Sequence, residues 1–567
     1  MSHNHLFKRW ILPQKIPADV DHSLKDYPHP IRQILFNRGF TDLDSCNAYL
    51  SAEYPLEKTD PFMLDGMEKA VQRIRESITY QLPIAVYGDY DVDGVTATAL
   101  LVEVLGQLGA RVVPYIPNRF DEGYGLNRKA IKILKEAGID LILTVDCGIR
   151  SVNEAKYAKK IGMGLIITDH HHPRGILPVA DSIICPKKSG DLYDFKELSG
   201  VGLAYKLAGA VLSTFPGNSI KLDEWLDLVA LGSVADMVPL IGENRMIVRQ
   251  GLEKIRSNPR IGLQALAKVS KVDLPRMNSN SIGFSFGPRL NAAGRIESAK
   301  KALQLLLVTE ETAAMKLAEE LNQQNLARQE LTKITQQQAI EIVKQSGRKL
   351  IFFADSPDFN QGILGLAASK LTEEYYRPAM VATRKMDGTI RASCRSIPEF
   401  DITRALDECV DLLIQHGGHK AAAGFTIQSE KLNVFLERMQ GIAERELGEL
   451  ELHPTLRADA QVTLTDLKPN LFEFMDLIEP IGMGNPLPIF YSKDVKVRLK
   501  KAVGKENNHL SLQLTDGQFT FDAIAFGFGE MVEKLPDKLD ILFSYEKNYY
   551  QDQVRPQLRI IDMKFSE

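Results

Sequence analysis

Cysteines and long apolar runs are scarce in this chain of 567 residues. The five cysteines are odd in number and widely spaced, and none forms a C-x-x-C pair, so we expect neither a zinc cluster nor a disulfide framework. The first ten residues lack the apolar core of a signal peptide, and no later run is apolar over the length of a membrane span. These absences favour a soluble protein of a reducing compartment, and we expect a cytoplasmic location without membrane contact.

Positive charge is not in excess either, because the net charge is −4 at pH 7. Proteins that coat nucleic acid usually carry a basic surface, so this balance argues against a broad coating role but allows a local basic channel. Basic residues gather around Arg289 and Arg295 and again between Lys493 and Lys505, where a solvated surface is the alternative to DNA contact. The G-x-x-x-x-G-K-[ST] motif is also missing, which argues against a P-loop nucleotide-binding ATPase.

The length predicts several domains, and patterns along the chain suggest their limits. Apolar runs alternate with helical patterns from about 83 to 172, which is typical of a parallel sheet built from βα units. The stretch 309–347 has no proline or glycine until its end and predicts a long helix; a coiled coil is the alternative, but its apolar positions hold no clean heptad. After residue 455, short alternating strands suit a small β-barrel. We therefore expect a helical extension over 1–80, a parallel-sheet α/β domain over 81–308, a connecting helix over 309–347, a further domain over 348–447 that opens on an apolar strand, and a barrel over 455–567.

Three alternating carboxylates give the strongest chemical signal. The apolar run 83–87 predicts a buried strand and leads into Asp89-Tyr90-Asp91-Val92-Asp93-Gly94. Carboxylates this close repel one another and raise each other's pKa, so the cluster is stable mainly when divalent cations neutralise it. A calcium loop would need Glu at its twelfth position, where counting from Asp89 gives Leu100, so that alternative fails. Metal-dependent phosphate chemistry is then the leading interpretation.

Acids follow two further predicted strands. The run 141–145 leads into Asp146, and the run 165–168 leads into Asp169-His170-His171. In open α/β sheets, ligands bind outside the carboxyl ends of the strands, so we expect Asp146 and His170 to converge there with the first acidic cluster. Ordinary loop histidines are the alternative for this histidine run. Asp236, after the apolar helical pattern 225–231, is the candidate that completes the set, although an isolated aspartate is usually a surface or capping residue.

These motifs resemble those of the DHH phosphoesterases. The matching stretches are the acidic motif at 89–94, Thr144-Val145-Asp146-Cys147-Gly148, Asp169-His170-His171 and Ala235-Asp236. In their order and spacing, three further stretches are similar to the RecJ branch of that family, and the resemblance covers nearly the whole chain. They run from Gly287 to Arg295, from Gly417 to Gly424 and from Gly482 to Pro486.

The resemblance implies a DHH catalytic domain over 81–308, a mixed α/β DHHA1 domain that binds substrate over 348–447, and an oligonucleotide-binding (OB) domain over 455–567. Together they would degrade single-stranded DNA from its 5′ end to 5′-mononucleotides, using two Mg²⁺ or Mn²⁺ ions. The implied metal ligands are Asp89, Asp91, Asp93, Asp146, His170 and Asp236. This chain departs from the family at Tyr87, where some relatives place a histidine, and Asp89 is expected to fill the gap.

Three residues are expected to act in catalysis. Asp146 and Asp236 are implied to bridge the two ions. His171 is expected to contact the scissile phosphate or to protonate the leaving oxygen. The alternative is that His171 only orients His170.

The same resemblance implies substrate contacts outside the metal cluster. They are Arg289, Asn291, Arg295, Arg391, Ser393, Arg395, Gly417, Gly418 and His419. The two glycines permit close backbone approach, and the residues after them are expected to open a helix whose N–H groups favour anions; a plain loop is the alternative. In the barrel, Phe519, Phe521, Phe526 and Phe528 invite base stacking, but alternating phenylalanines usually pack inward, so we name none as a site.

Beyond the reaction itself, the resemblance implies a monomer that acts in DNA recombination and repair, including mismatch repair. Its implied partners are single-strand-binding protein and a RecQ-type helicase. Two alternatives stay open. Relatives with the same metal core hydrolyse pyrophosphate, short oligonucleotides or cyclic dinucleotides, although those need no barrel. Degenerate DHH proteins serve as non-catalytic partners of replication helicases, but those are expected to have lost metal ligands that are all in place here.

Overall fold

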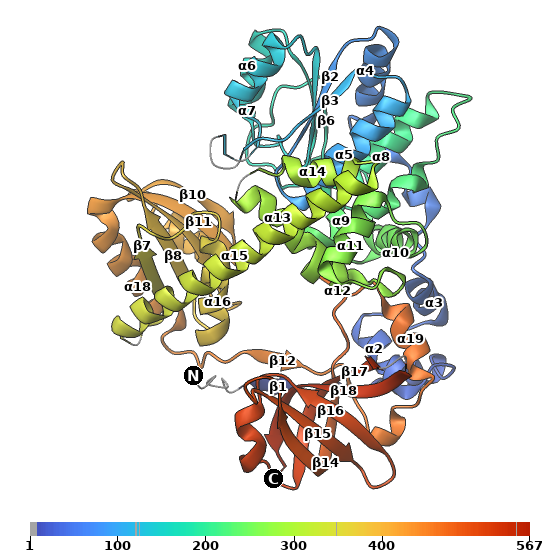
Figure 1. Ribbon diagram of the computed structural model, residues 1–567, viewed down its shortest axis with the longest axis vertical. Helices are drawn as coiled ribbons and strands as arrows, with labels where there is room; N and C mark the ends of the chain where they lie inside the picture. The colour runs from blue at the N-terminus through green and yellow to red at the C-terminus, as the bar shows by residue number, and fades with distance from the viewer. Residues whose placement is uncertain are drawn as a thin grey trace. The chain divides into compact units, whose positions relative to one another are not determined.

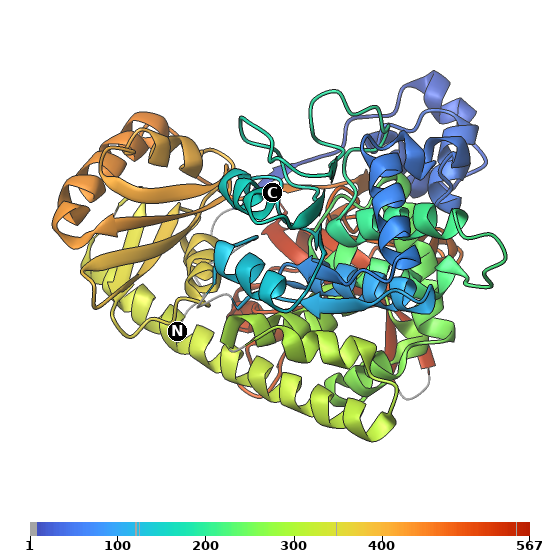
Figure 2. The ribbon, with the colours of Figure 1, turned by 90° about the horizontal axis from the view of Figure 1, so that it is seen from above.

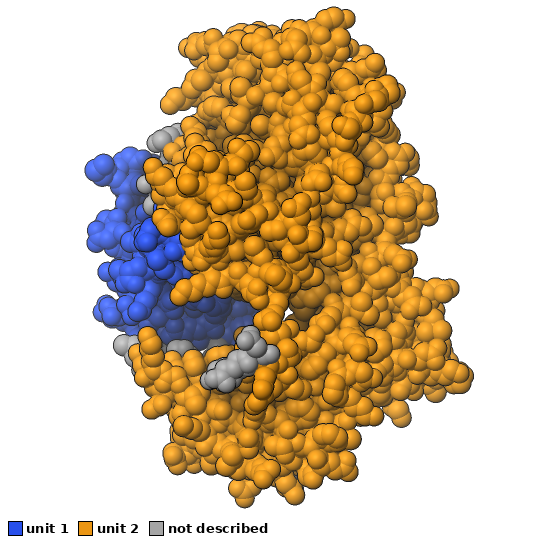
Figure 3. Space-filling view, turned by 45° about the vertical axis from the view of Figure 1, so that its right-hand side comes forward, with its two compact units in different colours: residues 1–9, 322–456 blue, residues 10–321, 457–567 orange. Residues whose placement is uncertain are grey.

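The computed structural model describes residues 8–118, 122–123, 125–296, 298–347, 349–550 and 553–566. The chain divides into two compact units, residues 1–9 with 322–456 and residues 10–321 with 457–567 (Figure 3). The division falls within the long helix α15 (Glu311–Gln345), which Figure 2 shows along its whole length. None of the described helices is long and apolar enough to cross a membrane.

A five-stranded parallel sheet forms the centre of the first α/β domain, in the order β3-β2-β4-β5-β6. Its strands are β2 (Ile84–Gly88), β3 (Val112–Tyr115), β4 (Leu141–Val145), β5 (Gly164–Thr168) and β6 (Ser182–Ile184). The register pairs Gly88 with Val145 and Val145 with Thr168, so the carboxyl ends of β2, β4 and β5 lie level at one edge. The predicted parallel sheet is confirmed.

Side chains that alternate along the strands enter two separate cores. Ile84 and Val86 belong to the core beneath α4 (Met67–Thr79), α5 (Val92–Gln107) and α8 (Gly200–Ser213). Ala85 and Tyr87 belong to the core beneath α6 (Arg128–Glu136) and α7 (Val152–Lys160). Figure 1 shows these two helix layers on opposite sides of the sheet. Every residue of β2 and β4 is buried, as expected of strands covered on both faces.

A group of helices follows the sheet. They are α9 (Leu226–Ala235), α10 (Gly242–Ser257), α11 (Ile261–Ser270), α12 (Ser279–Ser281), α13 (Gly287–Ile296) and α14 (Lys300–Leu307). Helix α9 is apolar along most of its length because it packs among α5, α8 and α10. A π-helical turn, Ile282–Phe286, joins α12 to α13. Short 3₁₀ turns lie at Leu56–Lys58, Pro61–Met63, Leu222–Trp225, Leu274–Arg276, Ser429–Lys431, Leu464–Asp466 and Gly529–Lys534.

The C-terminal strands close into a barrel. They are β14 (Phe490–Val503), β15 (His509–Thr515), β16 (Thr520–Ala525), β17 (Lys538–Tyr550) and β18 (Gln553–Phe565), with the short β13 (Ala460–Gln461) beside β14. Their order is β14-β15-β16-β18-β17, and β17 pairs back with β14. The predicted OB-like barrel is confirmed.

Helices from both sides of the sequence complete the barrel's core. They are α1 (Ala18–Ser23), α2 (His29–Asn37), α3 (Leu43–Ser51) and α19 (Leu471–Ile478). Leu24, Ile34 and Leu50 from the N-terminal region share one apolar cluster with Leu512 and Phe543 of the barrel. The strand β1 (Arg9–Ile11) pairs with β12 (Thr455–Arg457). Much of the N-terminal segment thus serves the barrel's stability.

The other unit contains a mixed five-stranded sheet in the order β10-β11-β9-β8-β7. Its strands are β7 (Phe352–Ser356), β8 (Ala379–Arg384), β9 (Thr389–Arg395), β10 (Leu413–His419) and β11 (Ala422–Gln428). Its helices are α16 (Leu364–Tyr375), α17 (Ile402–Asp407) and α18 (Leu432–Leu447). Val381 packs with α16 and Ala382 packs with α17 and α18, so helices cover both faces. The predicted mixed α/β domain is confirmed.

Candidate active site

The acidic motif after β2 opens helix α5. Asp91 is the N-cap residue, and its Oδ1 accepts hydrogen bonds at 3.1 Å from the backbone N–H groups of Asp93 and Gly94. A Cβ on Gly94 would lie only 2.5 Å from the backbone nitrogen of Asp89, so the tight turn needs glycine. Asp89 and Asp93 are buried by this turn at the carboxyl edge of the sheet.

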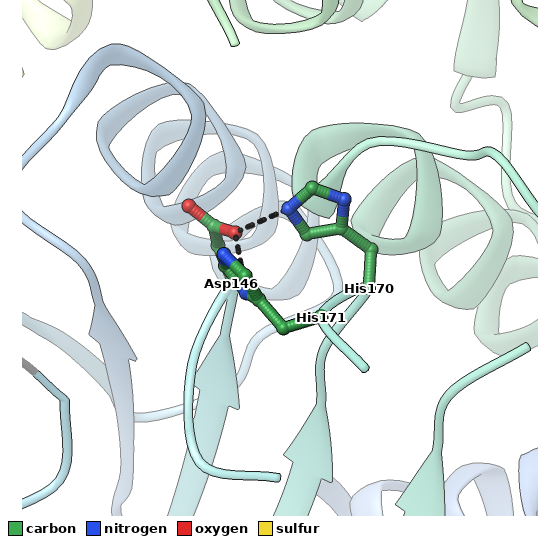
Figure 4. Close-up of side chains that lie close together, drawn as sticks. All are labelled: Asp146, His170 and His171. Carbon is green, nitrogen blue, oxygen red and sulfur yellow. Dashed lines mark ion pairs between the residues drawn. The ribbon is translucent and has the colours of Figure 1, made fainter. Parts of the chain in front are cut away.

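Asp146 follows β4 in the left-handed backbone region, with φ at +61°. Few non-glycine residues adopt this conformation, and its cost of about 1–3 kcal/mol is typical of functional positions. The Oδ1 of Asp146 lies 3.0 Å from Nε2 of His170 and 3.9 Å from Nδ1 of His171. Figure 4 shows both imidazole rings beside this carboxylate. The structure therefore brings the ends of β4 and β5 together around one buried oxygen.

Asp236 reaches the cluster from the C-terminal end of α9, outside the sheet. Its Oδ2 lies 3.5 Å from Nε2 of His170, and Oδ2 of Asp93 lies 3.9 Å from the same nitrogen. Asp93 is held by the N-terminus of α8, because the N–H groups of Gly200 and Val201 donate to its two carboxylate oxygens at 2.6 and 2.8 Å. All six predicted ligands thus lie in one cluster, and their role as ligands stays a prediction.

The cluster resists ionisation. Burial, followed by the charge of Asp91, raises the pKa of Asp93 to about 7. Burial also raises the pKa of Asp146 and of Asp236 well above the usual range, with the charge of Asp93 as the next cause. Burial lowers the pKa of His170 to about 3, so its imidazole is neutral at pH 7 and can offer a nitrogen lone pair. A cation at this site would relieve the repulsion among the carboxylates.

Two buried atoms fit a shared divalent ion. Among the described residues, Oδ1 of Asp146 and Nε2 of His170 have no hydrogen-bond partner, although they lie 3.0 Å apart. Two ligand atoms at about 2.1 Å from a cation and at right angles to each other would be separated by about 3.0 Å. Carboxylate oxygens dominate the donor set, which suits Mg²⁺ or Mn²⁺.

Ligand atoms gather in three overlapping groups among the described residues, each spanning no more than 4.8 Å. The groups are Asp146 with His170 and His171, Asp93 with His170 and Asp236, and Asp89 with Asp91 and Asp146. Asp146 and His170 each belong to two groups. Asp146 therefore lies where two of the possible ligand groups overlap.

Asp169 orients His171. Its Oδ1 accepts the backbone N–H of His171 at 3.0 Å and lies 2.7 Å from Nδ1 of the ring, while its Oδ2 accepts the N–H of Ile149 at 2.9 Å. Burial disfavours the charged imidazole, but the hydrogen bond and charge of Asp169 outweigh it and raise the pKa of His171. The side chain of His171 is 29% exposed, compared with 8% for His170. His171 is thus the more accessible and the more readily protonated of the two histidines. The sequence alone did not identify Asp169 as the partner of His171.

Tyr87 points away from the ligand cluster into the core beneath α6 and α7. Its hydroxyl donates to the carbonyl of Gly125 at 2.9 Å and accepts from Nδ2 of Asn127 at 3.0 Å. Its ring stacks on Tyr115 with centroids 5.1 Å apart. Tyr87 therefore supports the loop that follows β3. Asp89 remains the candidate ligand in place of the histidine that some relatives carry at the position of Tyr87.

Helix α13 packs on the acidic motif through a hydrogen bond and a close backbone approach at a glycine. The N–H of Val92 donates to Oδ1 of Asn291 at 3.2 Å, and a Cβ on Gly294 would lie 2.8 Å from the carbonyl oxygen of Tyr90. Asn291 thus supports the site through the backbone. Arg289 donates from Nη1 to the carbonyl of Ser285 at 2.8 Å, and burial lowers its pKa. The predicted contact Arg295 has its side chain outside the described residues.

The remaining predicted contacts lie in the mixed sheet of the other unit. Arg391, Ser393 and Arg395 alternate along β9 and share one face, where Nη1 of Arg395 donates to Oγ of Ser393 at 3.3 Å. Ser393 pairs with Gly424 on β11, which in turn pairs with Gly417 on β10. Because Gly424 and Gly417 carry no side chains, the sheet is thin beside Ser393.

The predicted helix after Gly418 is wrong. Gly417 and Gly418 belong to β10, and His419 pairs with Ala422 across a tight turn into β11. Gly418 has φ at +153°, and a Cβ there would lie 2.4 Å from Cα of Ala423. These glycines permit close strand pairing, so an anion held here would meet side chains rather than a helix N-terminus.

The barrel exposes aromatic and basic side chains. Phe521 and Phe528 are buried as expected, but Phe519 and Phe526 are 49% and 52% exposed, so the expectation that most of the four pack inward is wrong for two of them. Phe526 lies 5.1 Å from the ring of His509 and 5.5 Å from the guanidinium of Arg559. Lys493, Lys496, Lys500 and Lys501 of β14 are also exposed. An exposed aromatic ring and a cationic group therefore stand together on the barrel surface at Phe526 and Arg559.

Three parts of the chain match known domain families. Residues 83–233 match the DHH family, N-terminal domain, residues 331–445 match the DHHA1 domain, and residues 458–562 match the RecJ OB domain. The single-stranded-DNA-specific exonuclease RecJ of Bacillus subtilis is 38% identical over 566 residues, which cover 99% of this chain and 71% of that protein. The Escherichia coli protein of the same name is 32% identical over 523 residues, covering 88% of this chain and 89% of that protein.

Solved structures agree with these matches. RecJ from Thermus thermophilus in complex with Mn²⁺ aligns with a TM-score of 0.84 at 28% identity, covering 99% of this chain and 80% of that chain. An exonuclease RecJ bound to manganese aligns with a TM-score of 0.60 at 33% identity, covering 69% of this chain and 98% of that chain. From its domain order, its similarity to curated relatives and its fold, the chain belongs to the RecJ family of DHH proteins.

Proposed function

We propose that this chain is a metal-dependent exonuclease that degrades single-stranded DNA in the 5′ to 3′ direction to 5′-mononucleotides. The buried cluster around Asp146 and His170 carries the proposal, because its carboxylates and imidazole fit divalent cations. The names of the curated relatives, single-stranded-DNA-specific exonuclease RecJ, support the substrate. The 5′ polarity rests on the family resemblance.

The proposed ligands of two Mg²⁺ or Mn²⁺ ions are Asp89, Asp91, Asp93, Asp146, His170 and Asp236. Asp146 is the candidate to bridge them, since it belongs to two of the ligand groups; Asp236 is the second proposed bridge. Such ions, when bound, lower the pKa of a water and neutralise charge on a phosphodiester. Because the pKa of His170 is lowered, its imidazole is neutral and can bind a cation through the lone pair of Nε2. The N-terminus of α8 fixes the orientation of the Asp93 carboxylate.

His171 is the proposed proton donor. Asp169 raises its pKa against the effect of burial, so a larger share of the imidazole is protonated at neutral pH. The ring is partly exposed next to Asp146, where a phosphate would lie. His171 would then donate to the scissile phosphate or to the leaving oxygen, while Asp169 keeps Nδ1 occupied.

The other domains would hold the polymer. Residues 81–308 form the proposed DHH catalytic domain, with α15 connecting it to a DHHA1 domain over 348–447 and an OB-like domain over 455–567. Arg391, Ser393 and Arg395 with Gly417, Gly418 and His419 are the proposed clamp for the DNA backbone or its 5′ end. Arg289, Asn291 and Arg295 are the proposed contacts from the catalytic domain.

The cellular role proposed here rests on the family resemblance. It is recombination and repair of DNA, including mismatch repair, by a cytoplasmic monomer. Single-strand-binding protein and a RecQ-type helicase are the proposed partners.

The test is cleavage of single-stranded DNA labelled at either end, with Mn²⁺ or with EDTA, beside matched duplex and RNA. Immediate release of 5′-labelled mononucleotide, only with Mn²⁺ and only from single-stranded DNA, is expected. Early release from the 3′-labelled end would contradict the polarity. Hydrolysis of short oligonucleotides or cyclic dinucleotides without cleavage of any polymer would contradict the substrate.

A further inference from the structure

A tight turn before the barrel touches the segment that carries Asp236. The turn spans Gly482 to Asn485, with paired hydrogen bonds of 2.9 and 3.1 Å between the backbones of these two residues. Gly484 at its tip has φ at +71°, which favours glycine. The turn and Asp236 belong to the same compact unit.

The contact leaves little room for a Cβ at Gly482 or Gly484. The N–H of Leu240 donates to the carbonyl of Met483 at 2.7 Å. A Cβ on Gly482 would lie 2.8 Å from Cδ1 of Leu240, and one on Gly484 would lie 3.2 Å from Cβ of Pro239. The turn therefore fixes the backbone four residues after Asp236 by a hydrogen bond and by close packing.

The turn itself is anchored by buried polar contacts. Asn485 is 1% exposed, and its Nδ2 donates to the carbonyls of Ile478 and Pro480 at 2.8 and 2.6 Å. Its Oδ1 accepts the hydroxyl of Tyr49 at 2.7 Å. Arg245 of α10 donates to the carbonyls of Ile478 and Leu477 at 2.8 and 2.7 Å. Helices α3, α10 and α19 thus hold the turn in one place.

Asp236 needs such support more than the other proposed ligands do. The acids after β2 and the residues after β4 and β5 follow strands of one sheet, whereas Asp236 caps α9 and is followed by Met237 at φ +61°. The segment after Asp236 is also held by Asn244 of α10, whose Nδ2 donates to the carbonyl of Pro239 at 3.0 Å. The turn supplies a further restraint on the same short segment.

We infer that the Gly482–Asn485 turn is a positioning element that sets Asp236 at the metal site and so makes metal affinity depend on the region leading into the barrel. The inference rests on the proposed metal site. It assigns a role to a motif that lies outside the proposed ligand groups of the described residues.

The test compares Mn²⁺ affinity, measured from the EPR signal of unbound Mn²⁺, between the full chain and its variants. Gly482→Ala is expected to weaken Mn²⁺ binding about tenfold, as residues that support ligands commonly do. Adding Leu240→Val, which removes the Cδ1 atom in the way, is expected to restore most of the affinity. At saturating Mn²⁺, KM for single-stranded DNA should stay within about twofold of wild type.

Gly517→Ala is the matched control. Gly517 lies in a barrel hairpin with φ at +99°, and no atom of the described residues lies within 4 Å of a Cβ built there, so alanine strains the barrel without touching the Asp236 segment. It should leave Mn²⁺ affinity unchanged. Thermal unfolding checks that each variant is folded, and Gly484→Ala, whose Cβ would be less crowded, replaces Gly482→Ala if the latter does not fold.

Two results would overturn the inference. One is wild-type Mn²⁺ affinity in a folded glycine variant of the turn. The other is an equal loss in Gly517→Ala, because general loosening of the barrel would then explain the effect. If the wild-type chain binds Mn²⁺ but cleaves no DNA, the proposed function fails, while the binding comparison still decides the role of the turn.

Discussion

Removing divalent metal should destabilise the catalytic domain more at high pH than at low pH. Without a cation, Asp93, Asp146 and Asp236 have raised pKa values in the folded chain. A carboxyl group whose pKa is higher in the folded state stabilises the fold fully below its unfolded pKa and loses that contribution as pH rises through its folded pKa. The loss should therefore run from about pH 4 to about pH 7, the interval set by Asp93.

Asp93 sets the scale of this effect. A pKa that rises from 3.8 to about 7 corresponds to about 4 kcal/mol of lost stability above pH 7. Asp146 and Asp236 act in the same direction. Bound cations take the place of the protons, so Mn²⁺ should restore most of the loss at pH 8 and add little at pH 5.

The assay is urea unfolding followed by the fluorescence of Trp225, which is 3% exposed in the catalytic domain. Trp10→Phe removes the other of the two tryptophans. As a control, Asp146→Asn removes one charge from the cluster at nearly constant volume and should flatten the dependence on pH. Equal urea midpoints at pH 5 and pH 8 in EDTA, or an equal gain from Mn²⁺ at both, would refute the reasoning.

Four substitutions separate the roles of the site. Asp146→Ala should abolish turnover while single-stranded DNA binding, measured by fluorescence anisotropy, stays within about threefold of wild type; retained Mn²⁺-dependent cleavage would rule out the bridging role. His171→Gln should lower kcat about 10²-fold or more with little change in Mn²⁺ affinity, and a loss of Mn²⁺ binding instead would make it a ligand. Gly200→Ala places a Cβ 2.5 Å from that of Asp146 and should reduce kcat about 10²-fold in steady-state assays, whereas normal activity would show that the site tolerates the shift. Arg395→Ala should raise KM for single-stranded DNA about tenfold and leave kcat unchanged, and a loss confined to kcat would contradict its place in the clamp.

The sequence predicted the parts of the site that depend on the sheet. A buried run followed by an acid is visible locally, and parallel strands carry their carboxyl ends to one edge, which is why Asp146 and His170 lie together. The parallel sheet and the barrel followed from the same periodic patterns, whereas the mixed α/β domain was implied by the family resemblance.

Contacts between distant segments could not be predicted in this way. Gly200 holds Asp93 from 107 positions away, and the Gly482 turn touches Leu240, yet no local pattern links either pair. The helix expected after Gly418 failed because paired glycines also suit a tight strand hairpin, and tertiary pairing with β11 decides between the two. Phe526 stays exposed because it falls on the outward-facing positions of the alternation that buries Phe521 and Ala523.

The most direct test is the anomalous diffraction of a crystal soaked in Mn²⁺. We predict a manganese peak about 2.1 Å from both Oδ1 of Asp146 and Nε2 of His170, with a second ion near Asp89 and Asp91. The proposed metal site would be contradicted if manganese bound elsewhere and left these two atoms without an ion, while the same protein sample cleaved DNA with Mn²⁺.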